Sequence, residues 1–137
     1  MLKIHTDGGA RGNPGPAAIA FVIYDDQGEA VFSQGKYLGQ ATNNQAEYQA
    51  VEMAIDWLIK NAVNEESEFY LDSQLVANQL QGNFKIKNTE LKTVWEKIKK
   101  NILANKLVIK NFVYVPREKN ILADNLVNRI LDHSLSS

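Results

Sequence analysis

The apolar residues of this chain repeat at two different intervals, and the order of those intervals restricts the fold to few candidates. In the first part of the chain the interval is two, as in strands whose alternate side chains face opposite ways. We expect strands at Leu2–Thr6, Ala18–Tyr24 and Ala30–Leu38, with a hairpin turn at Asp25–Gly28 between the last two. The glycines and prolines of Gly8–Pro16 predict an irregular loop after the first strand.

Beyond this meander the interval changes, and helices alternate with short strands. An apolar stripe at helical spacing begins near Thr42, and serine, aspartate or asparagine residues stand where helices can start. The expected elements are a helix over Thr42–Ala62, a strand at Glu68–Leu71, a helix from Asp72 or Ser73 to Gln81, a helix over Thr89–Ala104, a strand at Leu107–Val115 and a last helix capped by Asn120.

The resulting order is strand, strand, strand, helix, strand, helix, helix, strand, helix. An antiparallel meander followed by strand–helix alternation indicates an α/β fold, in which helices flank a five-stranded mixed sheet. A chain of 137 residues without an internal linker fits one domain. We therefore expect residues 1–137 to form a single domain.

The composition excludes several classes of protein. There are no cysteines, so disulfides and thiolate metal sites are excluded, and the two histidines, His5 and His133, are too few for a zinc site of imidazoles. No apolar run reaches the roughly 18 residues that a membrane span needs. The N-terminus has no signal-peptide pattern. We expect a cytoplasmic protein that does not bind membranes.

The net charge of −1 hides an uneven distribution of charge. Residues 82–110 hold eight lysines and two glutamates, whereas residues 47–72 hold seven acids and one lysine. A basic face beside an acidic pocket suits a polyanion whose phosphates are reached through metal ions. A solvated lysine-rich helix face explains the first cluster equally well.

Four acids stand where this topology gathers functional groups. Asp7 and Asp72 end the first and fourth expected strands, and ligands of such sheets collect at the carboxyl ends of the strands. Glu47 and Asp124 are expected in the first turns of two helices, whose N-termini tolerate negative charge. Each acid also has a structural interpretation, as a turn former, a helix cap or a solvated helix residue.

The neighbours of these acids resemble four motifs of one family, the type 1 ribonucleases H. The matching segments are Thr6–Gly15 (TDGGARGNPG), Thr42–Glu47 (TNNQAE), Leu71–Val76 (LDSQLV) and Val115–Asp124 (VPREKNILAD). The last resembles the form of the short archaeal-type branch. The resemblance implies an RNase H-like fold with antiparallel strands 1–3 and parallel strands 1, 4 and 5.

The resemblance also implies an activity and its cofactors. Asp7, Glu47, Asp72 and Asp124 would be catalytic residues that bind two Mg²⁺ or Mn²⁺ ions, and oxygen-only ligands favour such hard metals. The enzyme would be an endonuclease that hydrolyses the RNA strand of RNA–DNA hybrids and leaves 5′-phosphate and 3′-hydroxyl ends. We expect it to act as a monomer.

Substrate contacts are implied on the same motifs. Backbone groups of Gly8 and Gly9 would approach the hybrid, whereas Asn13, Asn44 and Gln45 would follow its minor groove beside Asn43. Thr42 and Asn88 match positions that hold a phosphate of the DNA strand. For these side chains, turn-making and helix capping are the alternative interpretation.

The chain departs from the family pattern in two places. Many members carry a histidine in the loop before the last aspartate, and this loop has none. Arg117, Glu118 or Lys119 are the candidates for an auxiliary role there. Gln40 stands where some relatives place an arginine, which predicts a weaker grip on DNA.

Two other functions stay open at this point. A module that keeps the fold without the chemistry would bind nucleic acid and leave it intact. A resolvase or integrase type of nuclease would act on duplex DNA instead. The presence of all four acids argues against the first, and the glycine-rich segment with Asn43 and Asn44 argues against the second.

Overall fold

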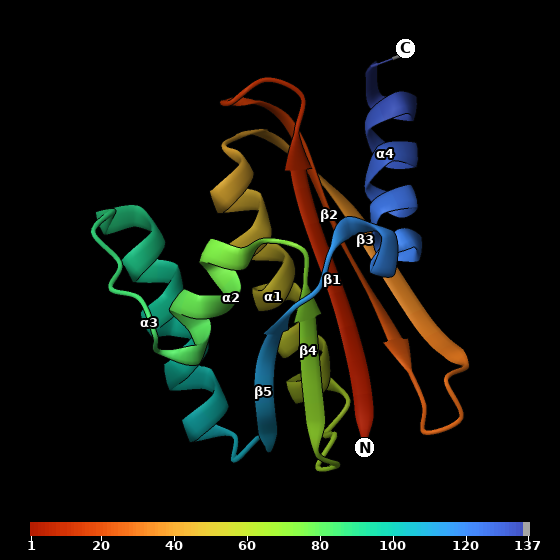
Figure 1. Cartoon of the computed structure of the whole chain (residues 1–137), viewed down its shortest axis with the longest axis vertical. Helices are drawn as coiled ribbons and strands as arrows, with labels where there is room; N and C mark the ends of the chain where they lie inside the picture. The colour runs from red at the N-terminus through yellow and green to blue at the C-terminus, as the bar shows by residue number, and fades with distance from the viewer. Residues whose placement is uncertain (136–137) are drawn as a thin grey trace.

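The computed structural model describes residues 1–135 and has the α/β fold expected from the sequence (Figure 1). Its five strands are β1 (Leu2–Ala10), β2 (Gly15–Tyr24), β3 (Ala30–Ala41), β4 (Ser67–Leu71) and β5 (Ile109–Tyr114). They form one sheet in the order β3-β2-β1-β4-β5. β1, β2 and β3 pair antiparallel, whereas β1, β4 and β5 pair parallel, as the sequence predicted.

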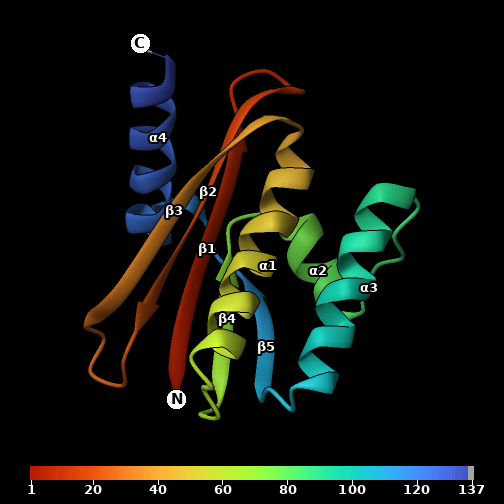
Figure 2. The ribbon, with the colours of Figure 1, turned by 180° about the vertical axis from the view of Figure 1, so that it is seen from behind.

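The helices lie on both faces of this sheet. They are α1 (Asn43–Lys60), α2 (Gln74–Gln81), α3 (Thr89–Ala104) and α4 (Ile121–Leu135), with a short 3₁₀ turn at Arg117–Lys119 before α4. Figures 1 and 2 show α1 and α4 on opposite sides of the sheet, with α2 and α3 beside α1. The N-terminus of α1 and the start of α4 therefore flank the central strand β1 from two sides.

The predicted loop at Gly8–Pro16 is wrong at both of its ends. Residues 8–10 continue β1 and pair with residues 17–19 of β2, so only residues 11–14 connect the two strands. Gly8 belongs to a regular strand, and its lack of a side chain is needed for close packing. A Cβ on Gly8 would lie 2.3 Å from the backbone of Ala46, so glycine is what allows α1 to approach β1 this closely.

The larger part of the core lies between the sheet and α1, α2 and α3. Alternate residues of the strands, such as Ile4, Phe21 and Phe69, face the stripe of α1 that contains Val51 and Ile55. This arrangement explains why the long helix showed a clear apolar stripe in the sequence. Trp57 packs against the same cluster, and its ring stacks on Phe32.

A smaller cluster joins the opposite face of β2 to α4. Ala18 and Ala20 of β2 pack against Val127 and Leu131 of α4. A Cβ on Gly35 of β3 would lie 2.4 Å from a methyl group of the same helix. Small residues on this face thus let α4 settle close to the sheet, and both faces of β2 are buried.

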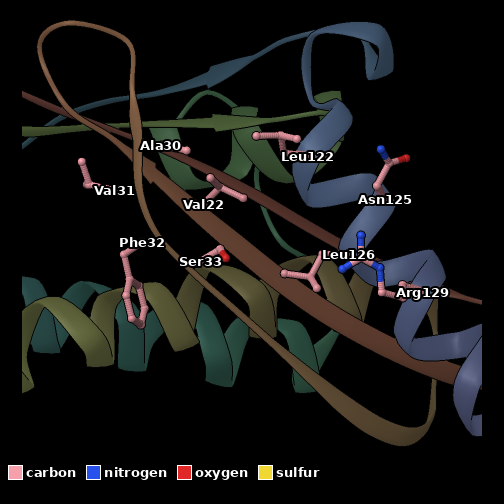
Figure 3. Close-up of a pocket in the computed structure, with 9 residues that line it drawn as sticks. All are labelled: Val22, Ala30, Val31, Phe32, Ser33, Leu122, Asn125, Leu126 and Arg129. Carbon is pink, nitrogen blue, oxygen red and sulfur yellow. The ribbon is translucent and has the colours of Figure 1, made fainter.

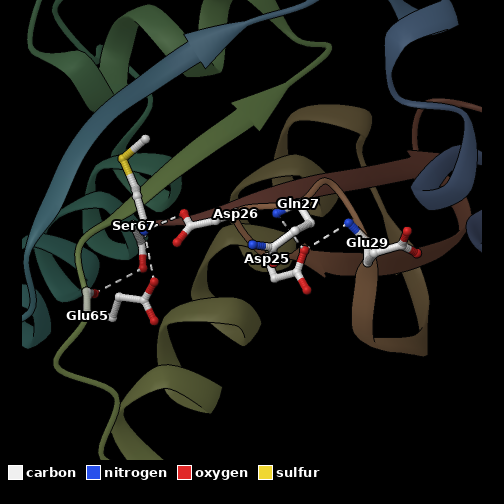
Figure 4. A network of polar contacts seen from close by, with 7 residues as sticks. Asp25, Asp26, Gln27, Glu29, Glu65 and Ser67 are labelled. Atoms are coloured by element: carbon white, nitrogen blue, oxygen red, sulfur yellow. Dashed lines mark hydrogen bonds and ion pairs between the residues drawn. The ribbon is translucent and has the colours of Figure 1, made fainter.

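The end of the sheet at which β1 begins is closed by polar contacts (Figure 4). The amino group of Met1 lies 2.7 Å from Asp26 and 2.9 Å from Glu65, which brings the β2–β3 turn to the segment before β4. Asp25 stabilises the turn, since its carboxylate accepts hydrogen bonds from the amides of Gln27 and Glu29. The turn between β2 and β3 therefore lies at this end of the sheet, and the candidate acids lie toward the other end.

Within residues 1–135, no helix combines the length and the apolar character that a membrane crossing requires.

Candidate active site

Asp7 and Asp72 lie together where the pairing of two neighbouring parallel strands stops. Pairing between β1 and β4 ends at Thr6 opposite Leu71. Asp72 directly follows β4, as predicted, whereas Asp7 does not end β1, because β1 continues beside β2 to Ala10. This is the edge at which parallel sheets gather their ligands.

Glu47 reaches the same place from α1, which covers one face of the sheet. The hydroxyl of Thr42 caps α1 by accepting the amide hydrogen of Gln45 at 3.1 Å, and the Gln45 side chain accepts the Thr42 amide hydrogen at 2.8 Å. This capping box fixes the start of α1. Glu47 lies one residue beyond the first turn, not within it as predicted. The Gly8 amide donates a hydrogen bond of 3.4 Å to its Oε1 atom.

The three acids form one group, and Asp124 stands beside it. Asp7, Glu47 and Asp72 each offer a carboxylate oxygen within 4.8 Å of the others. Asp124 lies in the first turn of α4, as predicted, and lines the same cavity of about 380 Å³. The structure thus brings all four predicted acids to one cavity, with Asp124 outside the tight group of three.

Burial and mutual repulsion perturb the two innermost carboxyl groups. Burial, with the charges of Asp72 and Asp124 added, raises the pKa of Asp7 from 3.8 to about 7. Burial also raises the pKa of Glu47 well above its usual range, and the neighbouring charges of Asp7 and Asp72 act in the same direction. Acids gathered in this way must either keep protons or take up cations.

The donor set fits a hard divalent cation. Glu47 Oε2 is buried without a hydrogen-bond partner among the described residues, although buried carboxylate oxygens normally have one. The ligand atoms on offer are all carboxylate oxygens, which Mg²⁺ and Mn²⁺ prefer over thiolate or imidazole ligands. A cation between the three acids would pair this oxygen and offset the repulsion that raises the two pKa values.

The predicted substrate contacts fall into two adjoining cavities. Gly8, Gly9, Asn43 and Asn44 line the cavity of the acids. A second cavity, of about 560 Å³, lies between the starts of α1 and α3 and is lined by the remaining predicted residues, which are Asn13, Thr42, Gln45 and Asn88, together with Asn43 and Asn44. The asparagines at positions 43 and 44 thus border both spaces.

Three of these asparagines use their oxygens to hold the structure. Asn43 accepts from the amide of Ala10, Asn13 accepts from the amide of Asn43, and Asn88 caps α3 by accepting from Leu91. Capping and turn-making, the alternative predicted for them, are therefore real. Within residues 1–135 the side-chain NH₂ groups of Asn13, Asn43 and Asn88 donate to no protein group, so they stay available to an acceptor from outside.

The candidates for an auxiliary role separate in space. Arg117 lines the cavity of the acids, whereas Glu118 and Lys119 occupy the exposed remainder of the 3₁₀ turn and do not line it. Arg117 is thus the candidate closest to the acids.

Sequence reasoning assigned no role to three other residues of this cavity, Arg11, Ser73 and Asn128. Arg11 forms an ion pair of 2.6 Å with Asp132 near the end of α4. Its place inside the glycine-rich motif was the available signal, because a cation in that segment comes near the acids by topology alone.

The lysines of residues 82–110 do not form one face. Lys97 pairs with Glu52 of α1 at 3.2 Å, and the Lys99 ammonium lies over the ring of Phe112 at 5.2 Å. Lys85 and Lys87, by contrast, are exposed in the connection that leads to Asn88 and the second cavity. Trp95 packs against the main core and donates to the carbonyl of Gln79, so it belongs to the core.

A further groove lies between β3 and α4 (Figure 3). It has a volume of about 380 Å³ and is lined by apolar side chains with Asn125 and Arg129 at its edge. No acid lines it, and Leu122 is its only residue from the four motifs, so it offers no comparable chemistry.

The sequence of this chain is similar to those of known proteins. A family described as reverse transcriptase-like matches residues 5–130. Ribonuclease HI of Halobacterium salinarum is 37% identical over 136 residues, which cover 95% of this chain and 65% of that protein. A bifunctional protein of Mycobacterium tuberculosis is 35% identical over 137 residues, which cover 99% of this chain. The chain spans 37% of the length of that mycobacterial relative.

A solved structure is similar over nearly the whole of both chains. The crystal structure of LC11-RNase H1 in complex with an RNA/DNA hybrid superimposes with a TM-score of 0.91 at 41% sequence identity. The match covers 98% of this chain and 99% of the other. At this identity and coverage, the similarity extends beyond the shared fold to the sequence of the whole chain.

Proposed function

Because this chain belongs to the type 1 ribonuclease H family, we propose that it is an endoribonuclease that hydrolyses the RNA strand of RNA–DNA hybrids. The observation that carries the proposal is the group of Asp7, Glu47 and Asp72, which lies where the pairing of β1 with β4 ends. It lies beside a cavity rimmed by arginine and asparagine side chains. We propose that the single domain described here is sufficient for this activity.

The four acids hold two Mg²⁺ or Mn²⁺ ions in this proposal. Asp7 and Glu47 would supply oxygens from the buried floor of the cavity, the half-buried Asp72 from beside them, and Asp124 from α4. When bound, such ions supply positive charge at the scissile phosphate and at the oxygens that attack and leave. The raised pKa values of Asp7 and Glu47 mean that ion binding displaces protons, so we expect metal affinity to rise with pH.

The cationic side chains of the cavity orient the scissile phosphate. Arg117 stands next to the acids and Arg11 is fixed by Asp132, so both can donate hydrogen bonds to phosphate oxygens without entering the group of acids. Attack of water in line with the bond from phosphorus to the 3′-oxygen breaks that bond. The products then carry a 5′-phosphate and a 3′-hydroxyl group.

The asparagines supply the preference for a hybrid. Their unpaired NH₂ groups can donate to acceptors of a minor groove, among them the 2′-hydroxyl, which is the group that separates RNA from DNA. The cavity between the starts of α1 and α3 suits a phosphate of the DNA strand, since Thr42 and Asn88 lie where the positive ends of two helices meet. The RNA strand would then lie over the acids.

The test is cleavage of an end-labelled RNA–DNA hybrid, compared with duplex DNA, duplex RNA and single strands, in Mg²⁺, Mn²⁺ or EDTA. We expect cuts in the RNA strand of the hybrid alone, none in EDTA, and 3′-hydroxyl ends that a polymerase can extend. Asp7→Asn should lower the rate on the order of 10³-fold or more, because several kcal/mol of charge stabilisation is lost.

The control variant is Asp56→Asn, which changes an exposed acid of the same charge on α1. It should cleave like the wild type. Binding of the hybrid without cleavage in either metal would favour a module that has lost the chemistry. Cleavage of duplex DNA would favour the resolvase or integrase type.

A further inference from the structure

A buried side-chain amide joins the start of α4 to β1. Asn120 directly precedes α4 and is only 1% exposed. Its Nδ2 atom donates a hydrogen bond of 2.8 Å to the carbonyl oxygen of Thr6, and its Oδ1 atom lies 3.1 Å from His5 Nδ1. The sequence predicted a helix cap at this position, but the side chain bonds to another element instead.

The two contacts fix the orientation of the amide and of the imidazole. The Thr6 carbonyl can only accept, so the NH₂ group of Asn120 must face it. The oxygen of Asn120 then faces His5, whose Nδ1 atom must carry the hydrogen. Neither partner can exchange roles, which makes the arrangement specific for an asparagine.

The imidazole that receives this contact is itself held in place. The His5 ring stacks on Tyr70 of β4 and meets Tyr24 of β2 edge-on, each with ring centroids 4.9 Å apart. His5 is half-buried between the two strands that flank β1. Asn120 is therefore bound to a rigid site on the sheet rather than to a mobile side chain.

The joined segments are the ones that carry two of the four acids. Thr6 directly precedes Asp7, and the Asp124 amide donates 3.0 Å to the carbonyl oxygen of Asn120 in the first turn of α4. Asn120 and Thr6 are 114 residues apart in the sequence. The Thr6 carbonyl stands where pairing with β4 ends. Asn120 thus links the strand segment before Asp7 to the helical turn that holds Asp124.

We propose that Asn120 is a positioning residue, which sets the distance of Asp124 from the three other acids, with His5 as its support. The inference rests on the proposed function, because it assumes that the four acids bind metal together. Neither residue touches the substrate in this proposal. Their effect reaches the reaction through the ligand geometry, as do the outer partners of metal ligands in general.

The test compares Asn120→Leu with Gln79→Leu. Gln79 is a second buried amide, 6% exposed, which accepts a hydrogen bond of 2.6 Å from Tyr48 within the core. Both variants lose a buried hydrogen bond and should lower the thermal midpoint. Only Asn120→Leu should weaken Mn²⁺ binding in titration calorimetry and lower kcat on the hybrid, each by about 10–100-fold, with KM nearly unchanged.

His5→Phe provides a variant that keeps the Thr6 anchor. Phenylalanine retains the stacking on Tyr70 but leaves Asn120 Oδ1 without a donor, so we expect Mn²⁺ affinity and kcat to fall severalfold in a folded protein. Wild-type Mn²⁺ affinity and kcat in a folded Asn120→Leu protein would overturn the proposal. If Asn120→Leu does not fold, the same result in His5→Phe overturns it.

Two further results separate the proposals from one another. A loss of Mn²⁺ affinity in Gln79→Leu equal to that in Asn120→Leu would show general loosening and would also overturn the role of Asn120. If the wild type binds Mn²⁺ but does not cut the hybrid, the proposed function fails. The Mn²⁺ titrations of the variants still decide the role of Asn120 in that case.

Discussion

At the scale of single residues, Asp7 illustrates how burial prepares a carboxyl group for a cation. The side chain is 5% exposed, and two neighbouring acids add to the penalty of burying its charge. In the metal-free protein the folded state therefore holds the Asp7 proton more tightly than the unfolded chain does. A bound cation offsets both the cost of burying the charge and the repulsion from the neighbouring acids. At neutral pH, Asp7 therefore destabilises the fold when metal is absent and stabilises it when metal is bound.

This linkage predicts a pH-dependent effect of Asp7→Asn in EDTA. A carboxyl group whose pKa is raised in the folded state contributes stability below its unfolded pKa and loses it as the pH rises through the folded value. For Asp7 that interval runs from 3.8 to about 7. Chemical denaturation at pH 8 should show the variant more stable than the wild type by a few kcal/mol, since one pKa unit corresponds to about 1.4 kcal/mol.

Near pH 4 the two proteins should be equally stable, because Asp7 is then protonated in the folded state. Saturating Mn²⁺ at pH 8 should reverse the order and favour the wild type. Asp56→Asn, on the exposed side of α1, should follow the wild type at both pH values. Equal stability of wild type and Asp7→Asn at pH 8 in EDTA would contradict the interpretation.

At the scale of elements, the close approach of α1 to β1 places Glu47 beside Asp7. The approach depends on Gly8, where an added Cβ would meet the Ala46 backbone at 2.3 Å. Backbone atoms of a capped helix cannot rotate away as a side chain can. A substitution at this position must therefore push α1 off the sheet and carry Glu47 with it.

Gly8→Ala and Gly9→Ala form a matched pair for this point. An alanine Cβ at position 9 would lie 3.7 Å from a Val127 methyl group, which is an ordinary contact. We expect Gly8→Ala to lower the free energy of unfolding by about 1–3 kcal/mol or more. Gly9→Ala should change it by less than about 1 kcal/mol. Urea denaturation of both variants measures the difference, and similar values for the two would argue against the tight contact.

The order and type of the elements could be predicted because local spacing determines them. The alternation in Leu2–Thr6 and the stripe through Ala50 and Ala54 follow from which side chains share a face. The end of β1 could not be predicted, since Gly8 looks like a loop residue until α1 is placed against it. The side chain of Asn120 was misassigned for a similar reason, because its partners lie more than a hundred residues away.

For the candidate site, too, only some features could be predicted from the sequence. Asp7 and Asp72 could be placed together because they were expected at the ends of two neighbouring strands, although β1 in fact continues past Asp7 to Ala10. The distance of Asp124 could not be predicted, since it depends on how α4 docks through small residues such as Ala18 and Ala20. Nor could the sequence separate Arg117 from Glu118 and Lys119, because a 3₁₀ turn decides which of them faces the acids.

At the scale of the whole molecule, acidic and basic side chains gather in different places, although the net charge is only −1. The acids lie at the open end of the sheet, and Lys85 and Lys87 lie in the exposed connection that leads to α3. Two other lysines of that region, Lys97 and Lys99, take part in an ion pair and a ring contact. Lys85 and Lys87 lie just before Asn88 of the second cavity in the chain and are therefore the lysines we expect to attract a polyanion there.

Removal of these two charges should weaken substrate binding. We expect Lys85→Ala combined with Lys87→Ala to raise KM for the hybrid and to leave kcat nearly unchanged. The slope of log KM against log salt should decrease by about 1 to 2, as for the loss of one or two phosphate contacts. The control pair is Lys60→Ala with Lys106→Ala, which lie at the last residue of α1 and just beyond the last residue of α3, far along both helices from the second cavity. An equal change of KM and slope in the control pair would exclude a local role for the connection.

The position of α4 has a consequence for synthesis of the protein on the ribosome. α4 follows all other described elements in the chain and occupies its own face of the sheet, so the layers formed by β1 to β5 with α1 to α3 are complete before it emerges. A nascent chain in that state holds Asp7, Glu47 and Asp72 but not Asp124. On the proposed function, cleavage of hybrids then appears only after translation has passed the last motif, and a chain released before α4 is made would lack the activity.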